Sequence, residues 1–206
     1  MVSADGSTRT ENITDWSIDQ FRTHYSDPSI TNWDIFHYIY GILHHPGYRE
    51  KYAANLRREL PRVPFAPDFR AFSDAGKRLA ELHVNYERQE EYQLTEIEAS
   101  GKPLDWRVTK MKLSKDKTWL VYNDFMTLAD IPPEVYEYRL GNRSALEWIV
   151  DQYRVTTDTR SGITNDPNNE EDRWYIRSLI KKIVTVSLET VKIVKGLPEF
   201  EERKAP

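Results

Sequence analysis

Residues 104–123 read LDWRVTKMKLSKDKTWLVYN and are rich in residues that favour β-strands. The polar triplet KDK at 115–117 interrupts this run, so we expect two strands joined by a turn at the triplet. Residues 135–140 (VYEYRL) predict a further strand, entered through two prolines at 132–133 and left through the Gly-Asn pair at 141–142. These segments predict a small antiparallel sheet in the middle of the chain.

The chain before this sheet has the apolar spacing of helices up to about residue 90. Thr14 is a candidate N-cap of a first helix, and Thr31 with Asp34 is a candidate capping box of a second. A third helix is expected over residues 48–60. Prolines at 61, 64 and 67 predict a stiff extended connector, which leads into a fourth, amphipathic helix.

After the sheet, Ser144 and Glu147 form a candidate capping box for another helix. Residues 154–172 are polar and are predicted to be a long loop. A long helix is expected over residues 173–195, and Gly196 with Pro198 ends it.

This order of elements predicts an α+β fold with an N-terminal helical half, a small antiparallel sheet and a long C-terminal helix. Residues 1–13 are expected to be a flexible lead-in, and residues 14–206 a single domain. Within that domain we expect a helical part over 14–90, a β-rich part over 91–153, the loop over 154–172 and the helix over 173–195.

The 206 residues include no cysteine, which excludes disulfides, thiolate metal sites and a cysteine nucleophile. Residues 1–11 contain no apolar signal-peptide core, and no apolar run approaches the roughly 20 residues that span a bilayer. A soluble cytoplasmic protein without membrane contact is expected. Its 12 Tyr, 7 Phe and 6 Trp can bury a large core.

The motifs of common catalytic sites are absent from the sequence. It has no glycine-rich phosphate loop with a following lysine, no G-x-S-x-G elbow and no Asn-Pro-Pro-aromatic loop of an adenine methyltransferase. His37 and His44 are two turns apart on a predicted helix, too far for one metal ion. No catalytic residue, metal site or cofactor is therefore expected in this chain, and the histidines are interpreted as half-buried hydrogen-bonding residues.

The net charge of −4 argues mildly against a free nucleic-acid binder, but the charges are segregated. Residues 107–117 carry five basic residues and one acid, whereas residues 87–98 carry five acids and one arginine. Four lysines cluster about the predicted hairpin, with aromatic residues between them. Such a ribbon could meet DNA phosphates, or it could be a solvated edge strand whose lysines prevent aggregation. Both interpretations remain open for Lys110, Lys112, Lys115 and Lys117.

A second polar group lies at the junction of the predicted strand 135–140 and the following helix. Arg139, Asn142 and Arg143 are of the types that read guanine and adenine bidentately. Plain turn chemistry is the interpretation that the sequence by itself favours for this group.

Six blocks carry a resemblance that covers nearly the whole chain from about residue 12. They are NITDWSIDQFRTHY (12–25), WDIFHYIYGILHHPGYREKYAANLRRELPRVPF (33–65), GKRLAELHVNYE (76–87), LVYNDFMTLADIPPEVYEYRLGNRSALEWIVDQYRV (120–155), RSGITNDPN (160–168) and VSLETVKIVKGLP (186–198). These blocks resemble the C-terminal specificity domain of Type ISP restriction-modification enzymes, a bacterial family. A tyrosine-rich helix followed by P-R-x-P-F is also similar to single-chain Type II restriction-methylation enzymes.

In that family one polypeptide carries a nuclease, an ATP-driven helicase-type translocase, a coupler, an adenine methyltransferase and a target-recognition domain. The resemblance implies that this chain is the C-terminal part of the last module, without catalysis of its own. It would bind double-stranded DNA and help to choose the sequence for methylation and cleavage in phage defence. S-adenosylmethionine, ATP and Mg are expected only in the upstream modules.

The resemblance also implies the methyltransferase and helicase/nuclease modules of the same enzyme as partners. The alternative is a docking domain that braces the recognition region against the methyltransferase or translocase with little DNA contact. The family's recognition region begins well before this chain, and its specificity residues differ between members, so no base contact is carried over. Arg57, Arg58 and Arg62 are further candidates, expected to touch the phosphate backbone beside a supporting tyrosine-rich helix.

Overall fold

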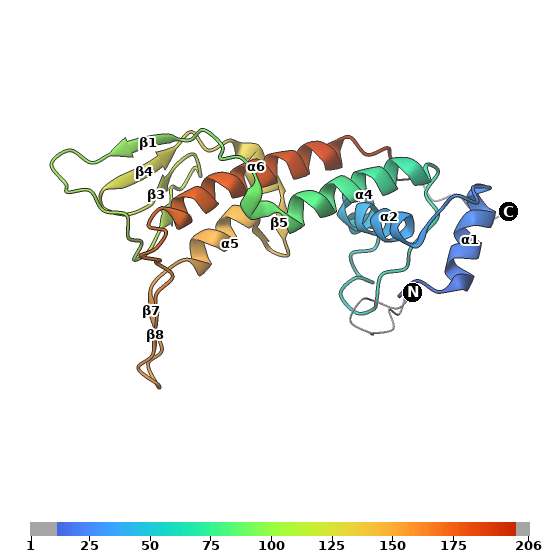
Figure 1. The fold of residues 1–206 in the computed structure, drawn as a ribbon, viewed down its shortest axis with the longest axis horizontal. Coiled ribbons are helices and arrows are strands. Elements are labelled where there is room, and N and C mark those ends of the chain that lie inside the picture. Colours follow the sequence, from blue (N-terminus) through green and yellow to red (C-terminus); the bar gives the residue numbers. More distant parts are fainter. Residues whose placement is uncertain (1–11, 201–206) are drawn as a thin grey trace. The chain divides into compact units, whose positions relative to one another are not determined.

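The computed structural model describes residues 12–200, in which helices come first and small antiparallel sheets follow before a long last helix (Figure 1). The predicted α+β class is confirmed. The described chain forms two compact units, one of residues 12–81 with 193–200 and the other Leu82–Lys192. Residues 1–11 of the expected flexible lead-in lie outside the described residues. A single domain over 14–206 stays a prediction.

The first two helices begin at the caps that the sequence predicts. Helix α1 (Asp15–Tyr25) follows Thr14, whose hydroxyl accepts a 3.2 Å hydrogen bond from the Ser17 backbone N–H. Helix α2 (Asn32–His44) begins with the complete capping box of Thr31 and Asp34. The reciprocal cap of α2 satisfies backbone donors that the first helical turn leaves unpaired. Helix α4 spans Phe69–Val84.

The third helix is much shorter than predicted. Helix α3 (Pro46–Lys51) ends before a series of turns over residues 52–59. Leu60, the last residue of the expected apolar stripe, is 90% exposed and packs against no core. Tyr52 and Leu56 still pack against the core, but the stripe has no core to meet at its end, so helical spacing was not sufficient here.

Helices α2 and α4 pack with their backbones in close contact at two glycines. A Cβ atom on Gly76 would lie 1.8 Å from the His37 carbonyl oxygen, and one on Gly41 would lie 2.4 Å from the Phe72 carbonyl oxygen. Only glycine allows this approach. It closes the aromatic core of the first unit, in which Tyr38 and Phe72 are fully buried.

Three tyrosine hydroxyls of this unit hold the proline-rich connector. The carbonyls of Arg62, Pro64 and Ala66 accept hydrogen bonds from Tyr48, Tyr38 and Tyr25, each 2.7 Å long. The three acceptors are alternate residues, as expected when an extended chain presents every second carbonyl to one side. The Ala66 N–H also donates to the Tyr38 hydroxyl at 2.7 Å. Tyr38 and Tyr48, which belong to the tyrosine-rich stretch, thus support the fold by binding an extended segment through their buried hydroxyls.

The second unit is built on a four-stranded antiparallel sheet in the order β1-β4-β3-β2. Its strands are β1 (Thr95–Glu98), β2 (Lys112–Leu113), β3 (Leu120–Val121) and β4 (Met126–Ala129). Leu113 pairs with Leu120, which pairs with Leu128, so these apolar side chains share the face that is buried. The predicted hairpin with a turn at 115–117 is confirmed as β2–β3.

The remaining elements of the second unit are short except for one helix. They are η1 (Tyr86–Arg88), η2 (Pro133–Glu137), β5 (Arg139–Leu140), β6 (Arg143–Ser144), α5 (Ala145–Gln152), β7 (Thr156–Thr157), β8 (Thr164–Asn165) and α6 (Tyr175–Lys195). The strand predicted over 135–140 is confined to β5, because a proline at the start of η2 favours a tight helical turn instead. The loop predicted over 154–172 contains the β7–β8 hairpin.

Helix α6 is bound to the sheet by charges as well as by apolar contacts. Lys181 is only 7% exposed, and its Nζ lies 2.6 Å from Glu96 Oε1 on β1 and 3.5 Å from Glu91 Oε2. Arg177 Nη1 lies 3.1 Å from the other oxygen of Glu96. Charges this far from water are tolerated because they are paired. Within residues 12–200, no helix has both the length and the apolar character needed to cross a membrane.

Candidate nucleic-acid interface

The lysines predicted to meet DNA lie along the outer strand of the four-stranded sheet. Strand β2 pairs only with β3, so it forms one edge. Met111 is buried and Leu113 packs against the core, so Lys110 and Lys112 alternate to the solvent side. Lys115 follows in the exposed turn. We call Lys110, Lys112 and Lys115 the lysine edge.

The turn of this hairpin is held by the carboxylate of Asp116. Its Oδ1 accepts hydrogen bonds from the Ser114 hydroxyl at 2.6 Å and from the Thr118 backbone N–H at 3.2 Å. Lys117 adopts a positive φ of 61° at the same turn. Residues that hydrogen-bond their own backbone stabilise such turns. The position of Lys115 on the turn is therefore defined although its side chain is exposed.

The fourth predicted lysine differs from the other three because it has partners within the fold. The Lys117 ammonium lies 2.7 Å from Glu147 Oε1 and 5.0 Å from the centre of the Tyr136 ring. Burial alone would raise the pKa of Glu147, yet hydrogen bonds from Lys117 and Ser144 hold it at about 2. No ion pair joins any residue of the lysine edge to another residue of the described chain. Three of the four lysines are thus available to an external anion.

The second predicted group is engaged in local contacts. The Arg139 guanidinium donates to the Asn142 carbonyl across the β5–β6 turn, and Arg143 Nη1 lies 2.7 Å from Asp151 Oδ2. These contacts agree with the turn-chemistry interpretation. Direct DNA contact by Arg139, Asn142 or Arg143 stays a prediction.

Asp151 nevertheless brings the lysine edge and the second group together. Its pKa is lowered by the hydrogen bond from Arg143 and by the charges of Arg154 and Lys110. Arg154 Nη1 lies 3.3 Å from Asp151 Oδ1. Two guanidinium groups therefore pair with one carboxylate and Lys110 acts on it through its charge, so the local charge remains positive. Sequence patterns missed Arg154 because it lies at the start of a polar loop.

The third predicted group belongs to the first unit. Arg57 and Arg58 are exposed on the turns after α3, and Arg62 lies at 4.0 Å from Glu59. Their side chains are accessible, and contact with phosphates stays a prediction. The carbonyl of Arg62 has the separate structural role of accepting from Tyr48.

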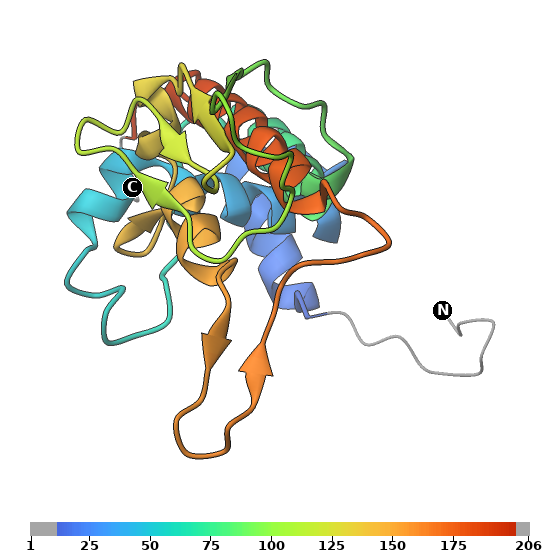
Figure 2. The ribbon, with the colours of Figure 1, turned by 90° about the vertical axis from the view of Figure 1, so that its left-hand side faces the viewer.

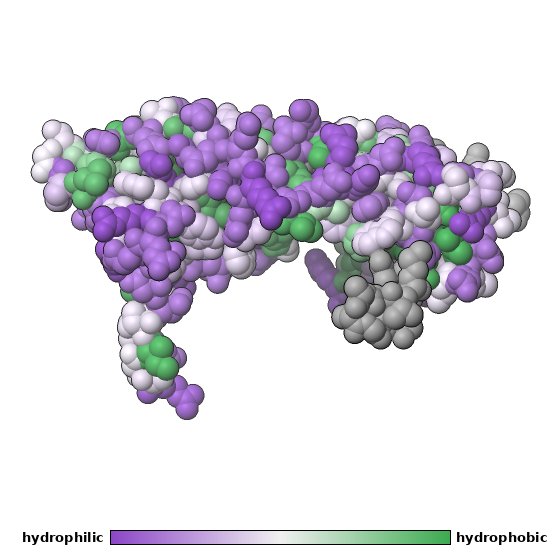
Figure 3. Space-filling view, in the orientation of Figure 1, coloured by the Kyte–Doolittle hydropathy of each residue, from purple (hydrophilic) through white to green (hydrophobic). Residues whose placement is uncertain are grey.

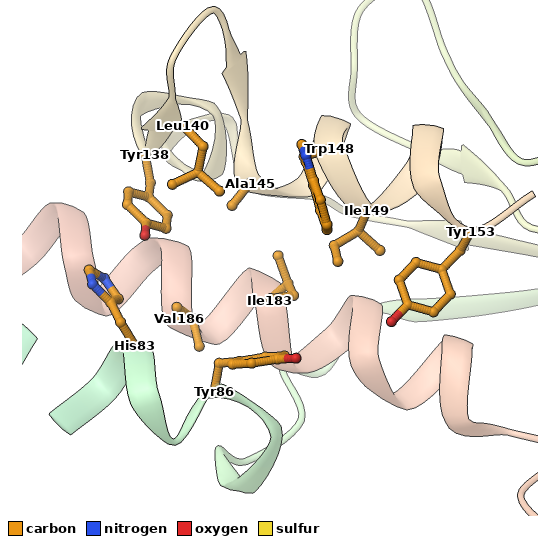
Figure 4. A pocket seen from close by; sticks show the side chains of 10 residues that line it. All are labelled: His83, Tyr86, Tyr138, Leu140, Ala145, Trp148, Ile149, Tyr153, Ile183 and Val186. Atoms are coloured by element: carbon orange, nitrogen blue, oxygen red, sulfur yellow. The ribbon is translucent and has the colours of Figure 1, made fainter. Parts of the chain in front are cut away.

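The second unit also contains an apolar pocket of about 350 Å³, shown in Figure 4. The His83 and Tyr138 rings stack at one side of it, with centroids 5.1 Å apart, and His83 Nε2 lies 2.8 Å from the Thr190 hydroxyl. Exposed Trp148 and Leu140 contribute to its lining. The pocket presents mostly hydrocarbon and ring surface, which suits an apolar contact more than an ionic ligand.

The histidines take part in hydrogen bonds and ring stacking. His44 Nδ1 lies 2.8 Å from the Tyr40 carbonyl oxygen, and His45 Nε2 lies 3.1 Å from that of Pro198. The His24 ring stacks on Phe65 at 4.1 Å. Between residues 12 and 200, no three side chains of His, Cys, Asp or Glu gather in a way that could hold a metal ion.

The solved structures that are similar to this chain include three protein–DNA complexes. A nuclease-deletion mutant of the Type ISP restriction-modification enzyme LlaGI, in complex with a DNA substrate mimic, is 39% identical with a TM-score of 0.77, over 85% of this chain and 17% of that chain. The ATP-dependent Type ISP restriction-modification enzyme LlaBIII bound to DNA is 35% identical with a TM-score of 0.79, over 89% of this chain and 12% of that chain. A DrdV–DNA complex is 37% identical with a TM-score of 0.81, over 95% of this chain and 21% of that chain.

The chain thus corresponds to about a fifth or less of each of these proteins. No curated protein matches it. The family model of the Type ISP C-terminal specificity domain matches residues 2–180. The predicted resemblance is confirmed, and the chain belongs to the family of Type ISP C-terminal specificity domains.

Proposed function

We propose that this chain is a DNA-binding target-recognition module of a Type ISP restriction-modification enzyme. It helps to select the DNA sequence for adenine methylation and cleavage and catalyses neither step. The three similar proteins are described as complexes with DNA or a DNA mimic, which supports DNA as the ligand. The observation that carries the proposal is the lysine edge, whose three cations have no ion-pair partner in the described chain.

The lysine edge can bind a polyanion although the whole chain has a charge of −4. Salt screens charges that are more than about 10 Å apart, so a phosphate at the edge responds to nearby lysines and little to distant acids. Each phosphate that a lysine neutralises releases condensed counterions, which makes affinity fall with salt. Arg154 and Lys110 around Asp151 extend the positive potential beyond the strand.

The salt dependence of DNA binding tests the proposal. The 206-residue chain is titrated with duplexes that it selects from a random-sequence library and with scrambled duplexes, over a range of salt. Replacing Lys110, Lys112 and Lys115 together by Met should weaken both and reduce the slope of log K against log salt by about 3, roughly one per phosphate contact.

Lys117→Met is the matched control on the same hairpin. Its ammonium is already paired with Glu147, so its loss should change the slope by much less than one lysine of the edge. An unchanged slope in the triple variant would exclude the lysine edge from the DNA surface. A wild-type chain that binds no duplex at all would contradict the proposed function itself.

The remaining functions of the full enzyme lie outside this chain in our proposal. S-adenosylmethionine, ATP and Mg are bound by the methyltransferase, helicase and nuclease modules, and these modules are the chain's protein partners. The cytoplasm is the proposed location, where the enzyme would meet both host and phage DNA. Enzyme activity is expected only when these modules are joined to the specificity domain.

One observation favours the alternative of a docking domain. Trp148 and Leu140 are exposed at the apolar pocket of the second unit, and exposed apolar surface often marks protein contacts. A photo-crosslinking survey of residues 90–160 separates the two functions. Crosslinks to DNA support target recognition, whereas crosslinks only to the other modules favour docking.

A further inference from the structure

The β7–β8 hairpin projects from the second unit as a narrow two-stranded ribbon, coloured orange in Figures 1 and 2. Thr156 pairs with Asn165 and Thr157 with Thr164. All side chains from 156 to 166 are exposed, so the ribbon buries nothing of its own. An element without a core of its own adds little to stability and is free to serve an external contact.

The tip of this ribbon is ordered by its own hydrogen bonds. Asp158 Oδ1 accepts from the backbone N–H groups of Arg160 at 3.0 Å and Ser161 at 2.7 Å. The Gly162 N–H donates to the Asp158 carbonyl at 2.9 Å, and Gly162 has a φ of 71°. Hydrogen bonds lower the pKa of Asp158, the one from the Ser161 N–H most of all. A preformed tip loses less entropy when it binds.

The side chains at the tip are suited to a hydrogen-bonding partner. Arg160 has no ion pair with any residue in the described part of the chain. Threonine and serine hydroxyls surround it, and residues 156–165 carry one acid and one base. Ile163 is 70% exposed and is the only large hydrophobic residue between positions 156 and 165. Figure 3 shows the projecting ribbon with little hydrophobic surface.

The base of the ribbon is tied to the segment that leads into the lysine edge. The Val155 N–H donates to the Thr109 carbonyl at 2.9 Å, next to Lys110. The Asn168 side chain accepts from the Val108 N–H at 2.7 Å and donates to the Val108 carbonyl at 2.8 Å. Both ends of the ribbon therefore leave the unit beside the cations that would meet the phosphates.

The acidic residues near the base do not oppose an anion as strongly as their number suggests. Asp166 is paired with Arg107, and Glu170 lies 3.5 Å from Arg107 and 3.8 Å from Arg173. The charges of Asp166 and Glu170 are therefore largely compensated within the fold.

We infer that the β7–β8 hairpin enters the major groove of duplex DNA and that Arg160 donates to a base edge there. The inference rests on the proposed function and adds a residue that charge clustering did not identify. The major groove, about 12 Å wide, admits a two-stranded ribbon, whereas the minor groove, about 6 Å wide, distinguishes little more than A·T from G·C pairs. Arginine binds guanine O6 and N7 bidentately, and an exposed isoleucine can contact a thymine methyl group.

Protection of guanine N7 from methylation measures this contact directly, because N7 faces the major groove. The full chain and its variants are compared on the duplexes that the wild type selects. Arg160→Ala should lose about 5- to 150-fold in affinity and the protection of one guanine. Arg160→Lys keeps the charge but not the planar fork, so it should lose the same protection.

Arg88→Ala is the matched control, because Arg88 is an exposed arginine on η1 in the same unit. It should leave both the affinity and the protection unchanged. Unaltered guanine protection in Arg160→Ala, or wild-type behaviour of Arg160→Lys, would overturn the inference. In both cases wild-type binding and the effect of the lysine-edge variant would persist, so the proposed function would stand. A wild-type chain without DNA binding would overturn both.

Discussion

The proline-rich connector at 61–67 and the β7–β8 hairpin are both extended, but they are held in different ways. The connector is bound by hydroxyls of Tyr25, Tyr38 and Tyr48, which come from three helices. The hairpin is bound by contacts within itself, centred on Asp158, and by backbone contacts at its base. The connector is therefore part of the folded structure of its unit. The hairpin, by contrast, is attached to a unit that does not depend on it for its core.

This difference bears on what each region can tolerate. A substitution in the tyrosine set leaves buried backbone groups without partners, which costs folding free energy. A substitution on the hairpin alters only exposed surface. A recognition module benefits from the second arrangement, because its contact surface can change while its fold is retained.

The largest expected effect comes from separating helices α2 and α4 of the first unit. In Gly76→Ala the new methyl would meet the His37 carbonyl oxygen, so α2 and α4 must move apart. We expect a loss of about 3 kcal/mol in the free energy of unfolding, at the upper end of overpacking effects. Chemical denaturation measures it. Gly162→Ala on the hairpin is the comparison: it has open space around its Cβ but a φ of 71°, and should cost about 1 kcal/mol. Equal losses of unfolding free energy in the two variants would contradict the expected difference between the first unit and the hairpin.

Removal of one connector contact is the next prediction. Tyr38→Phe leaves the Ala66 N–H and the Pro64 carbonyl without their 2.7 Å partner. The expected loss is about 2 kcal/mol in the free energy of unfolding, the typical cost of unsatisfied buried groups. Tyr92→Phe is the control, since the structure shows no hydrogen bond of the Tyr92 hydroxyl among the residues it describes. A Tyr38 variant as stable as the control would show that packing alone holds the connector.

The β2–β3 turn is an intermediate case, because one carboxylate links it to helix α5. Glu147→Gln should lower the free energy of unfolding by about 1 kcal/mol at pH 7, a discounted value because Lys117 is partly exposed. The folded-state pKa of Glu147, about 2, is below its unfolded value. Its contribution is therefore complete above about pH 5 and is lost as pH falls toward 2. Denaturation of both proteins at several pH values should show their difference shrinking over this window. A constant difference would contradict the ion pair.

The smallest effect on stability is expected from shortening the hairpin. Replacing residues 158–163 by Asn-Gly joins the paired Thr157 and Thr164 through a two-residue turn. The free energy of unfolding should change by less than about 0.5 kcal/mol, because no buried side chain is removed. Guanine N7 protection should be lost in the same variant. A large loss of stability would place the hairpin with the connector as part of the fold.

Local signals in the sequence predicted the helix starts well. The capping boxes Thr31–Asp34 and Ser144–Glu147 involve residues three positions apart, so both partners are visible in one short segment. Turn chemistry likewise predicted the β2–β3 hairpin. The third helix was overextended because spacing says nothing about whether Leu60 has a core to pack against.

Contacts between distant residues could not be predicted. Tyr25 and Ala66 are 41 positions apart, and Lys117 and Glu147 are 30 apart. The sequence presented four equivalent lysines on the hairpin, and only the fold distinguishes the one that is paired. The β7–β8 strands escaped notice because Thr156–Thr157 and Thr164–Asn165 have no apolar alternation.

The tyrosine contacts also affect how a protease would meet this protein. An extended stretch outside helices and sheets is ordinarily a good place for cleavage, since it fits a protease cleft without unfolding. Here residues 62, 64 and 66 are bound through their carbonyls, so a protease must wait until the segment detaches. The rate of cutting at the connector would thus report how often the first unit opens locally while the rest of the chain stays folded.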